Sequence, residues 1–280
     1  MNKEFVFRFR EGSFLLGSRT YIMGIINATP DSFSDGGDNF LPENALNTAI
    51  EMQNSGADIL DIGGQSTRPG ATLISPEEEW TRLEKVLPLI LNATTLPVSV
   101  DTFYPEVAKK SLEMGAHIIN DVSGTVNPQM AEVVKEYGAG WILMHSGEES
   151  DSDISGCIHN RLLNMLNTAV SLGVNFENIC LDAGIGFGKN MEQNLTLIYE
   201  TNRVKVEGNA YLIGASRKRF LGAAIGNNDL EFKQRDYATL AVNTVGILGG
   251  ADILRVHNVK AAVQAALVTD KIREKGKRND

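Results

Sequence analysis

A short apolar segment that ends at a polar residue or a glycine turn occurs eight times along this chain. Helical periodicity fills most of the intervals, so the pattern predicts a strand followed by a helix, eight times over. Eight such units close into a barrel of parallel strands, and the active site of such a barrel lies at the carboxyl ends of its strands. The segments end at Asn27, Gly63–Gly64, Asp101, Asn120, His145, Asp182, Ser216 and His257. We therefore expect these ends to surround one pocket.

The length fits this α/β fold, a (β/α)8 or TIM barrel, because 280 residues are usual for one such unit. We expect residues 1–280 to form a single domain. Two apolar segments, FVFRF and FLLG, precede the first barrel strand and predict an N-terminal β-hairpin that closes the bottom of the barrel. Farther along, Ser75 is predicted to cap a helix, and Pro88 to bend that helix or end it early.

Composition and charge exclude several classes of function. With 42% hydrophobic and 22% charged residues the chain is typical of globular proteins, and it has no apolar stretch long enough to span a membrane. A net charge of -9 disfavours binding to nucleic acid. Cys157 and Cys180 lack the spacing of metal ligands, and the first residues lack a secretion signal. We expect a cytoplasmic protein that binds small molecules, without nucleic-acid or membrane partners.

Two long loops after predicted strands have the composition of ligand-binding segments. The first, from Asn27 to Gly37, surrounds one aromatic residue, Phe33, with Asn, Thr, Ser and Asp, and can hold a divalent cation or a polar substrate. The second, from Gly63 to Gly70, presents Arg68 among glycines, where a guanidinium suits two-point binding of phosphate or carboxylate. An ordinary turn-rich connection and a surface arginine remain the structural alternatives.

Acidic residues end two of the predicted strands. Asp101 and Asp182 follow strands that should be buried on both faces, where a carboxylate is costly unless it binds something. Together with Asn120, they can recognise a flat heterocycle that carries ring N–H and amino groups. An internal salt bridge or a helix N-cap is the alternative for each aspartate. Asp61, inside the second strand, can face either the pocket or the packed core, and the role of His145 stays open.

Cations follow the last two predicted strands. Lys218 and Arg219 lie at the start of a helix, where side chains and backbone N–H groups can face an anion. Arg255 and His257, two positions apart at a strand end, share one face and can flank a phosphate. Phe187, in a glycine-dense turn after the sixth strand, can form an apolar wall. That turn lacks the acidic position expected of a dinucleotide-binding fold, so we do not expect such a site.

Seven segments, taken together and in order, carry a resemblance to a known family. They are MGIINATPDSFSDGG, DILDIGGQSTRPG, VSVDTF, GAHIINDVSG, LDAGIGFGK, GASRKRF and DILRVHNV. The chain resembles the dihydropteroate synthases from about Tyr21 to the last helix. This resemblance implies a homodimeric barrel enzyme of folate biosynthesis that requires Mg2+. The implied reaction joins 6-hydroxymethyl-7,8-dihydropterin diphosphate to 4-aminobenzoate, with release of diphosphate, by a dissociative substitution at the pterin methylene.

The same resemblance implies a role for individual residues. The pterin would be bound by Asp101, Asn120, Asp182, Lys218 and Arg255. The diphosphate would contact Asn27, Arg68, Arg255 and His257, and Mg2+ would be bound by Asn27 and Asp35. The 4-aminobenzoate would lie among Phe33, Thr67, Pro69, Phe187 and Arg219. The residues expected to take part in catalysis are Asp101, Arg68, Lys218, Arg255 and His257.

The sequence departs from the usual family motifs at several positions, and two alternative functions remain open. Gln65 stands where the family frequently has Glu, and Arg219 where Ser is common. One alternative is a pterin-binding barrel that transfers a methyl group from a folate to a corrinoid protein, which would not need the diphosphate-facing residues of the first two loops. The other is a non-catalytic pterin-binding paralogue, which would be expected to lack one of the cations that face the diphosphate.

Overall fold

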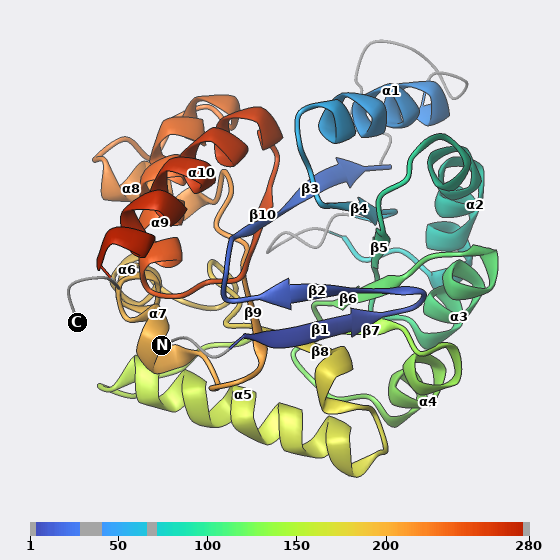
Figure 1. Ribbon diagram of the computed structural model, residues 1–280, viewed down its shortest axis with the longest axis horizontal. Coiled ribbons are helices and arrows are strands. Elements are labelled where there is room, and N and C mark those ends of the chain that lie inside the picture. Colours follow the sequence, from blue (N-terminus) through green and yellow to red (C-terminus); the bar gives the residue numbers. More distant parts are fainter. Residues whose placement is uncertain (1–3, 29–40, 66–71, 277–280) are drawn as a thin grey trace.

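The computed structural model describes residues 4–28, 41–65 and 72–276, and within them eight parallel strands close into a barrel (Figure 1). The strands are β3 (Tyr21–Asn27), β4 (Ile59–Gly63), β5 (Val98–Asp101), β6 (Ile118–Asp121), β7 (Gly140–Met144), β8 (Ile179–Asp182), β9 (Ala210–Ile213) and β10 (Ile253–Val256). Each strand pairs with the next in sequence, and β10 pairs with β3 to close the ring. The predicted TIM barrel is confirmed.

Helices surround the barrel on its outer side (Figure 1). They are α1 (Leu41–Asn54), α2 (Pro76–Ala93), α3 (Pro105–Met114), α4 (Pro128–Tyr137), α5 (Ile154–Ser171), α6 (Met191–Tyr199), α7 (Thr201–Val204), α8 (Arg219–Ala224), α9 (Asp236–Leu248) and α10 (Val259–Gly276), with 3-10 turns η2 (Phe176–Asn178) and η3 (Lys233–Arg235). No helix among the described residues is long and apolar enough to cross a membrane.

Helix α2 shows how local signals and packing compete. Its predicted cap is confirmed, because the Ser75 side chain accepts a hydrogen bond from the backbone N–H of Glu78 at 3.2 Å. The expectation that Pro88 ends the helix early is wrong, since the helix continues to Ala93. Leu87 and Ile90, on either side of the proline, are completely buried. Their burial favours continuation of the helix, at the cost of the backbone hydrogen bond that proline cannot donate.

An antiparallel hairpin closes the bottom of the barrel, as predicted. Strands β1 (Phe5–Phe9) and β2 (Gly12–Leu16) pair with each other and lie across the barrel (Figure 1). Phe7 and Leu16 pack with buried residues from the first halves of the barrel strands, among them Ile118. At Gly140 a Cβ atom would lie only 2.9 Å from the Phe7 ring, so glycine permits this close approach. The bottom of the barrel is therefore filled mostly by apolar side chains, and the active site of such a barrel lies at its other end.

Candidate active site

The carboxyl ends of the strands bring acidic and amide side chains from distant parts of the sequence together. Asp101 on β5 lies directly beside Asn120 on β6 in the strand register, and Asp182 occupies the corresponding end of β8. All three are buried, as is Asp61 on β4. Four polar residues buried in one barrel mouth indicate a site built for a ligand, because burial of such groups is otherwise unfavourable.

Arg255 on β10 connects two of these carboxylates. Its Nε donates to Asp61 Oδ2 at 2.6 Å, and its Nη2 donates to Asp101 Oδ2 at 2.7 Å. Asn120 Nδ2 donates to the same oxygen of Asp61 at 3.2 Å. Asp61, which the sequence left open, therefore belongs to the mouth of the barrel. The second oxygens of Asp61 and Asp101 are buried and have no hydrogen-bond partner within the described residues, so both remain available as acceptors.

Burial dominates the electrostatics of these acids. It raises the pKa of Asp101 from its ordinary value of 3.8 to about 7, against the opposing charge of Arg255 and with a further increase from Asp61. Burial also raises the pKa of Asp182, which the Lys218 charge opposes. A carboxylate with so little hydration gains strongly from any cation or N–H donor that a ligand brings.

Lys218, the residue before α8, completes this side of the mouth. Its ammonium donates a hydrogen bond to the carbonyl of Ile185 and lies 4.2 Å from the centre of the Phe187 ring. Burial lowers the pKa of Lys218 to about 7, while Asp182 opposes that shift. Asp182 accepts a hydrogen bond from the backbone N–H of Gly184 at 2.7 Å. The glycine-dense turn after β8 thus contacts both charged residues.

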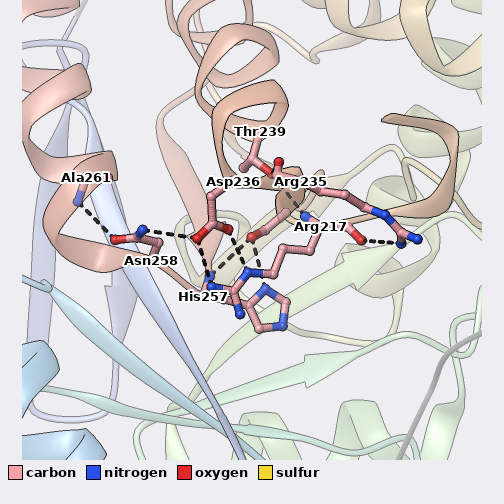
Figure 2. A network of polar contacts seen from close by, with 8 residues as sticks. Arg217, Arg235, Asp236, Thr239, His257, Asn258 and Ala261 are labelled. Atoms are coloured by element: carbon pink, nitrogen blue, oxygen red, sulfur yellow. Dashed lines mark hydrogen bonds and ion pairs between the residues drawn. The ribbon is translucent and has the colours of Figure 1, made fainter. Parts of the chain in front are cut away.

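His257 lies at the end of β10, within a network that joins the last two strand-to-helix turns. Its Nδ1 is 2.9 Å from Ser216 Oγ. Figure 2 shows Asp236 between Arg217 and Asn258 in this network, and Arg217 contacts Asp236 at 2.6 and 2.9 Å. Burial has the largest single effect on Asp236 and would raise its pKa, but the hydrogen bonds from Arg217 and Asn258 and the charge of Arg217 together outweigh it and hold that pKa below its ordinary value. These contacts fix the turn that presents His257.

The remaining predicted residues lie farther out or outside the described residues. Asn27 is half-buried at the carboxyl end of β3, next to Gly63 in the strand register. Arg219 is exposed at the first position of α8, and Phe187 is half-buried. Five predicted site residues lie outside the described residues, and their roles stay predictions: Phe33, Asp35, Thr67, Arg68 and Pro69.

Glu79 on α2 is a buried acid that the sequence did not single out as functional. Its two carboxylate oxygens accept hydrogen bonds from Gln65 Nε2 at 3.2 Å and from Thr102 Oγ1 at 2.8 Å. Burial raises the pKa of Glu79 to about 7. Because Thr102 follows Asp101 directly, Glu79 ties the end of β4 to the strand that carries Asp101. In the sequence, Glu79 lies in a capped amphipathic helix, and this pattern predicts a helix but no functional role for the residue.

Lys189 is a second residue of this region that the sequence did not single out. It is buried in the turn between β8 and α6, and its ammonium is 3.0 Å from Nδ1 of His145. Burial lowers the pKa of His145 to about 4, so the ring is neutral at ordinary pH. A lysine among Gly and Asn residues has the composition of an exposed loop, and the GFGKN segment gives no signal that it is buried.

Comparison with known proteins identifies the family of the chain. The family model described as "Pterin binding enzyme" matches residues 23–257. A dihydropteroate synthase of Clostridium beijerinckii is 42% identical over 260 residues, which are 92% of this chain and 96% of that protein. The crystal structure of dihydropteroate synthase from Clostridium difficile in the presence of pteroic acid has a TM-score of 0.87 at 41% identity, covering 92% of this chain and 98% of that one. The Xanthomonas albilineans dihydropteroate synthase, solved with 4-aminobenzoic acid, has a TM-score of 0.88 at 36% identity, covering 93% and 95%.

Proposed function

Since the chain belongs to the pterin-binding enzymes and, among them, to the dihydropteroate synthases, we propose that its barrel mouth forms 7,8-dihydropteroate. The substrates are 6-hydroxymethyl-7,8-dihydropterin diphosphate and 4-aminobenzoate, and diphosphate is the second product. The observation that carries the proposal is the cluster of the buried Asp61, Asp101 and Asn120 with the half-buried Arg255, and with Asp182 and Lys218 beside it. A solvated anion site would not need so many buried acceptors.

The pterin ring suits the acceptors of this cluster. Its amino group and ring N–H are donors, and Asp182 and the free oxygen of Asp101 are acceptors in the mouth. Asn120 supplies both a donor and an acceptor, and Lys218 can donate to the ring carbonyl. The Arg255 guanidinium, held flat by two carboxylates, can lie against the ring face. This assignment uses Asp101, Asn120, Asp182, Lys218 and Arg255 as the pterin site.

The charges also fit a dissociative substitution. An arylamine is a weak nucleophile, so the bond between the pterin methylene carbon and the diphosphate oxygen breaks first, and its electron pair leaves with diphosphate. Asp101, ionised, stabilises the cation delocalised over the methylene and the dihydropterin ring. Arg255 and His257 stabilise the departing diphosphate, together with Arg68 of the second loop. The amine nitrogen then bonds to the methylene carbon and releases its proton to solvent or diphosphate.

We also propose a Mg2+ ion bound by Asn27 and Asp35 together with the diphosphate. The donor set fits, because Mg2+ prefers oxygen ligands and is commonly held by one or two protein side chains plus substrate phosphates. Asn27 offers an amide oxygen at the carboxyl end of β3. When bound, Mg2+ supplies positive charge that favours departure of the diphosphate.

The 4-aminobenzoate is proposed to occupy the outer part of the mouth. Phe187, half-buried beside Lys218, supports an apolar wall there. Phe33, Thr67 and Pro69 of the two long loops complete this subsite, and the exposed Arg219 faces the substrate carboxylate. Sulfonamides, which share the arylamine and an anionic end, would compete for the same place.

The protein is further proposed to be a cytoplasmic homodimer. Support comes from exposed apolar side chains on two packed outer helices, which a partner copy would cover. They include Tyr237, Val245 and Leu248 of α9 and Leu267 and Ile272 of α10. Among these, Tyr237 is 85% exposed, which is unfavourable for a large aromatic side chain without a partner.

The decisive assay combines purified protein with the pterin diphosphate, 4-aminobenzoate and Mg2+. Dihydropteroate and diphosphate should appear in equal amounts, and omission of either substrate should abolish both products. Pterin binding without product would favour the non-catalytic paralogue. Methyl transfer from a folate to a corrinoid protein, without arylamine transfer, would favour the methyltransferase alternative.

A further inference from the structure

The ammonium of Lys189 is held by three partners in the turn between β8 and α6. Its Nζ donates to the carbonyl oxygens of Gly184 at 3.2 Å and of Phe187 at 3.0 Å. Its third contact is His145 Nδ1, at 3.0 Å. An ammonium group has three donors, so these contacts use all of them. The side chain is only 9% exposed, and it therefore supports the turn from inside.

His145, at the end of β7, acts as an acceptor in this arrangement. Burial, and then the charge of Lys189, lower its pKa to about 4. The neutral ring accepts from Lys189 at Nδ1, so its proton is on Nε2. That nitrogen lies 3.3 Å from Glu149 Oε1, which also accepts from Arg161 Nε at 2.9 Å. The contacts extend from the turn to the segment that follows β7.

The turn held by Lys189 carries the groups that contact the proposed pterin site. Ile185 supplies the carbonyl that accepts from Lys218, Phe187 supplies the ring beside the Lys218 ammonium, and Gly184 donates to Asp182. The turn is tightly packed against its neighbours. A Cβ atom at Gly184 would lie 1.8 Å from the carbonyl oxygen of His145, and one at Gly186 would lie 2.6 Å from Lys218 Cδ. A shift of this turn would therefore move Lys218 as well.

We propose that Lys189 is a positioning residue for the transfer reaction: through His145 and two backbone carbonyls it fixes the turn from Gly184 to Phe187, and so the Lys218 ammonium. The inference rests on the proposed function. It adds to that function a residue that touches neither substrate and acts by positioning others. The charge of Lys189 adds to the lowering of the Lys218 pKa that burial chiefly causes, and it opposes the rise that burial causes in the pKa of Asp182.

The first test is kinetic and uses Lys189→Met, which keeps an unbranched side chain one heavy atom shorter and removes its donors. We expect kcat/KM for the pterin diphosphate to fall about 30- to 100-fold, because small displacements of positioned groups cost about that much. The matched control is Lys205→Met. Lys205 also donates to a backbone carbonyl, that of Gly250 at 2.9 Å, and lies 3.5 Å from Asp252, but at the bottom of the barrel. The kcat/KM of Lys205→Met should stay within about threefold of the wild type.

The pH dependence separates positioning from a general loss of structure. Lys218 faces Asp182, Arg255, Lys189 and Asp101. Removal of the Lys189 charge should raise the pKa of Lys218 and shift the alkaline limb of kcat/KM to higher pH. Lys205→Met should leave that limb in place. An unshifted limb in Lys189→Met, together with kcat/KM like that of the wild type, would overturn the proposal.

A measurement without substrates keeps this test separate from the proposed function. Nitrogen-15 NMR of the histidine rings reports the tautomer and pKa of His145, which Lys189, Glu149 and Arg161 face. Wild-type His145 should carry its proton on Nε2 at neutral pH, and its pKa should rise in Lys189→Met. An inactive wild type with this NMR result would refute the proposed function alone. An unchanged His145 signal would refute the role of Lys189 whatever the activity.

If Lys189→Met does not fold, His145 provides a milder pair of variants. His145→Leu removes one of the three acceptors, and we expect about a 3- to 10-fold loss in kcat/KM for the pterin diphosphate. His145→Gln offers an amide oxygen to Lys189 and should recover most of that loss. Equal activity of the leucine and glutamine variants would contradict the proposed contact.

Discussion

Replacing Arg255 with methionine removes a guanidinium that two buried carboxylates share. Arg255 donates to Asp61 at 2.6 Å and to Asp101 at 2.7 Å, and the exposed fractions of the two aspartate side chains are 0% and 5%. Loss of one partner of a buried ion pair commonly lowers the free energy of unfolding by about 3–5 kcal/mol. We expect the lower end for Arg255→Met because the Arg255 side chain is 20% exposed, so water can reach its place and solvate part of the two carboxylates.

The cost should grow with pH. The folded-state pKa of Asp101, about 7, is above its ordinary value of 3.8, so bound protons stabilise the fold below that ordinary value. This stability is lost as the pH rises through the folded-state pKa. Arg255 lowers the pKa of Asp101, so its removal extends the loss to higher pH. Each additional proton bound contributes about 1.4 kcal/mol per pH unit.

Urea denaturation at about pH 6 and about pH 8 measures both effects. The control is Arg217→Met, which breaks an ion pair of similar geometry with Asp236 at 2.6 Å. Burial raises the pKa of Asp236, and the hydrogen bonds from Arg217 and Asn258 lower it below its ordinary value. In Arg217→Met the carboxylate keeps its hydrogen bond from Asn258 at 3.1 Å, and its side chain is 18% exposed, so we expect it to stay ionised across this range. Arg217→Met should therefore cost nearly the same at both pH values. The reasoning fails if Arg255→Met shows no larger cost at the higher pH.

Two further predictions concern buried acids. Asp101→Asn should lower kcat about 100-fold or more while pterin affinity falls less, because the carboxylate charge is needed chiefly when the pterin becomes cationic; steady-state kinetics and pterin titration check this, and equal losses would contradict it. Glu79→Gln should reduce the loss of stability as the pH rises from about 5 to about 7 by up to about 1.4 kcal/mol per pH unit, because the Glu79 pKa of about 7 is raised by burial. Urea midpoints over that range measure the slope, and an unchanged slope would refute the role of Glu79.

The sequence identified those site residues that the barrel pattern itself exposes. In a parallel strand that is buried on both faces, a polar residue at the carboxyl end is conspicuous, and Asp101, Asn120 and Asp182 all have that place. Asp61 remained open because it lies within its strand, before the end. Its partner Arg255 is 194 positions away, and periodicity carries no information about such a pair.

The pattern of strand ends does not predict which loop residues are buried. Lys189 has an ordinary loop composition around it, and its burial follows from backbone with positive φ at Gly184, Gly186 and Gly188, which curls around the ammonium. Pro88 illustrates the opposite error. Local propensity predicted a bend or an early end of α2, and the early end is wrong because the buried side chains on either side of the proline maintain the helix.

The central claim is that buried carboxylates in the barrel mouth bind the pterin, and a pair of matched variants tests it directly. Asp182 and Asp121 are both buried at carboxyl ends of barrel strands. Asp182 faces the mouth, whereas Asp121 accepts a hydrogen bond from the indole of Trp141 at 3.3 Å, and Trp141 packs in the core between the strands and the outer helices.

Calorimetric titration with 6-hydroxymethylpterin should therefore separate the two. Asp182→Asn should weaken binding about 100-fold, since a carboxylate that accepts from the ligand is replaced by an amide that offers N–H to its donors. Asp121→Asn should bind within about threefold of the wild type. Wild-type affinity in Asp182→Asn, or equal losses in both variants, would contradict the account.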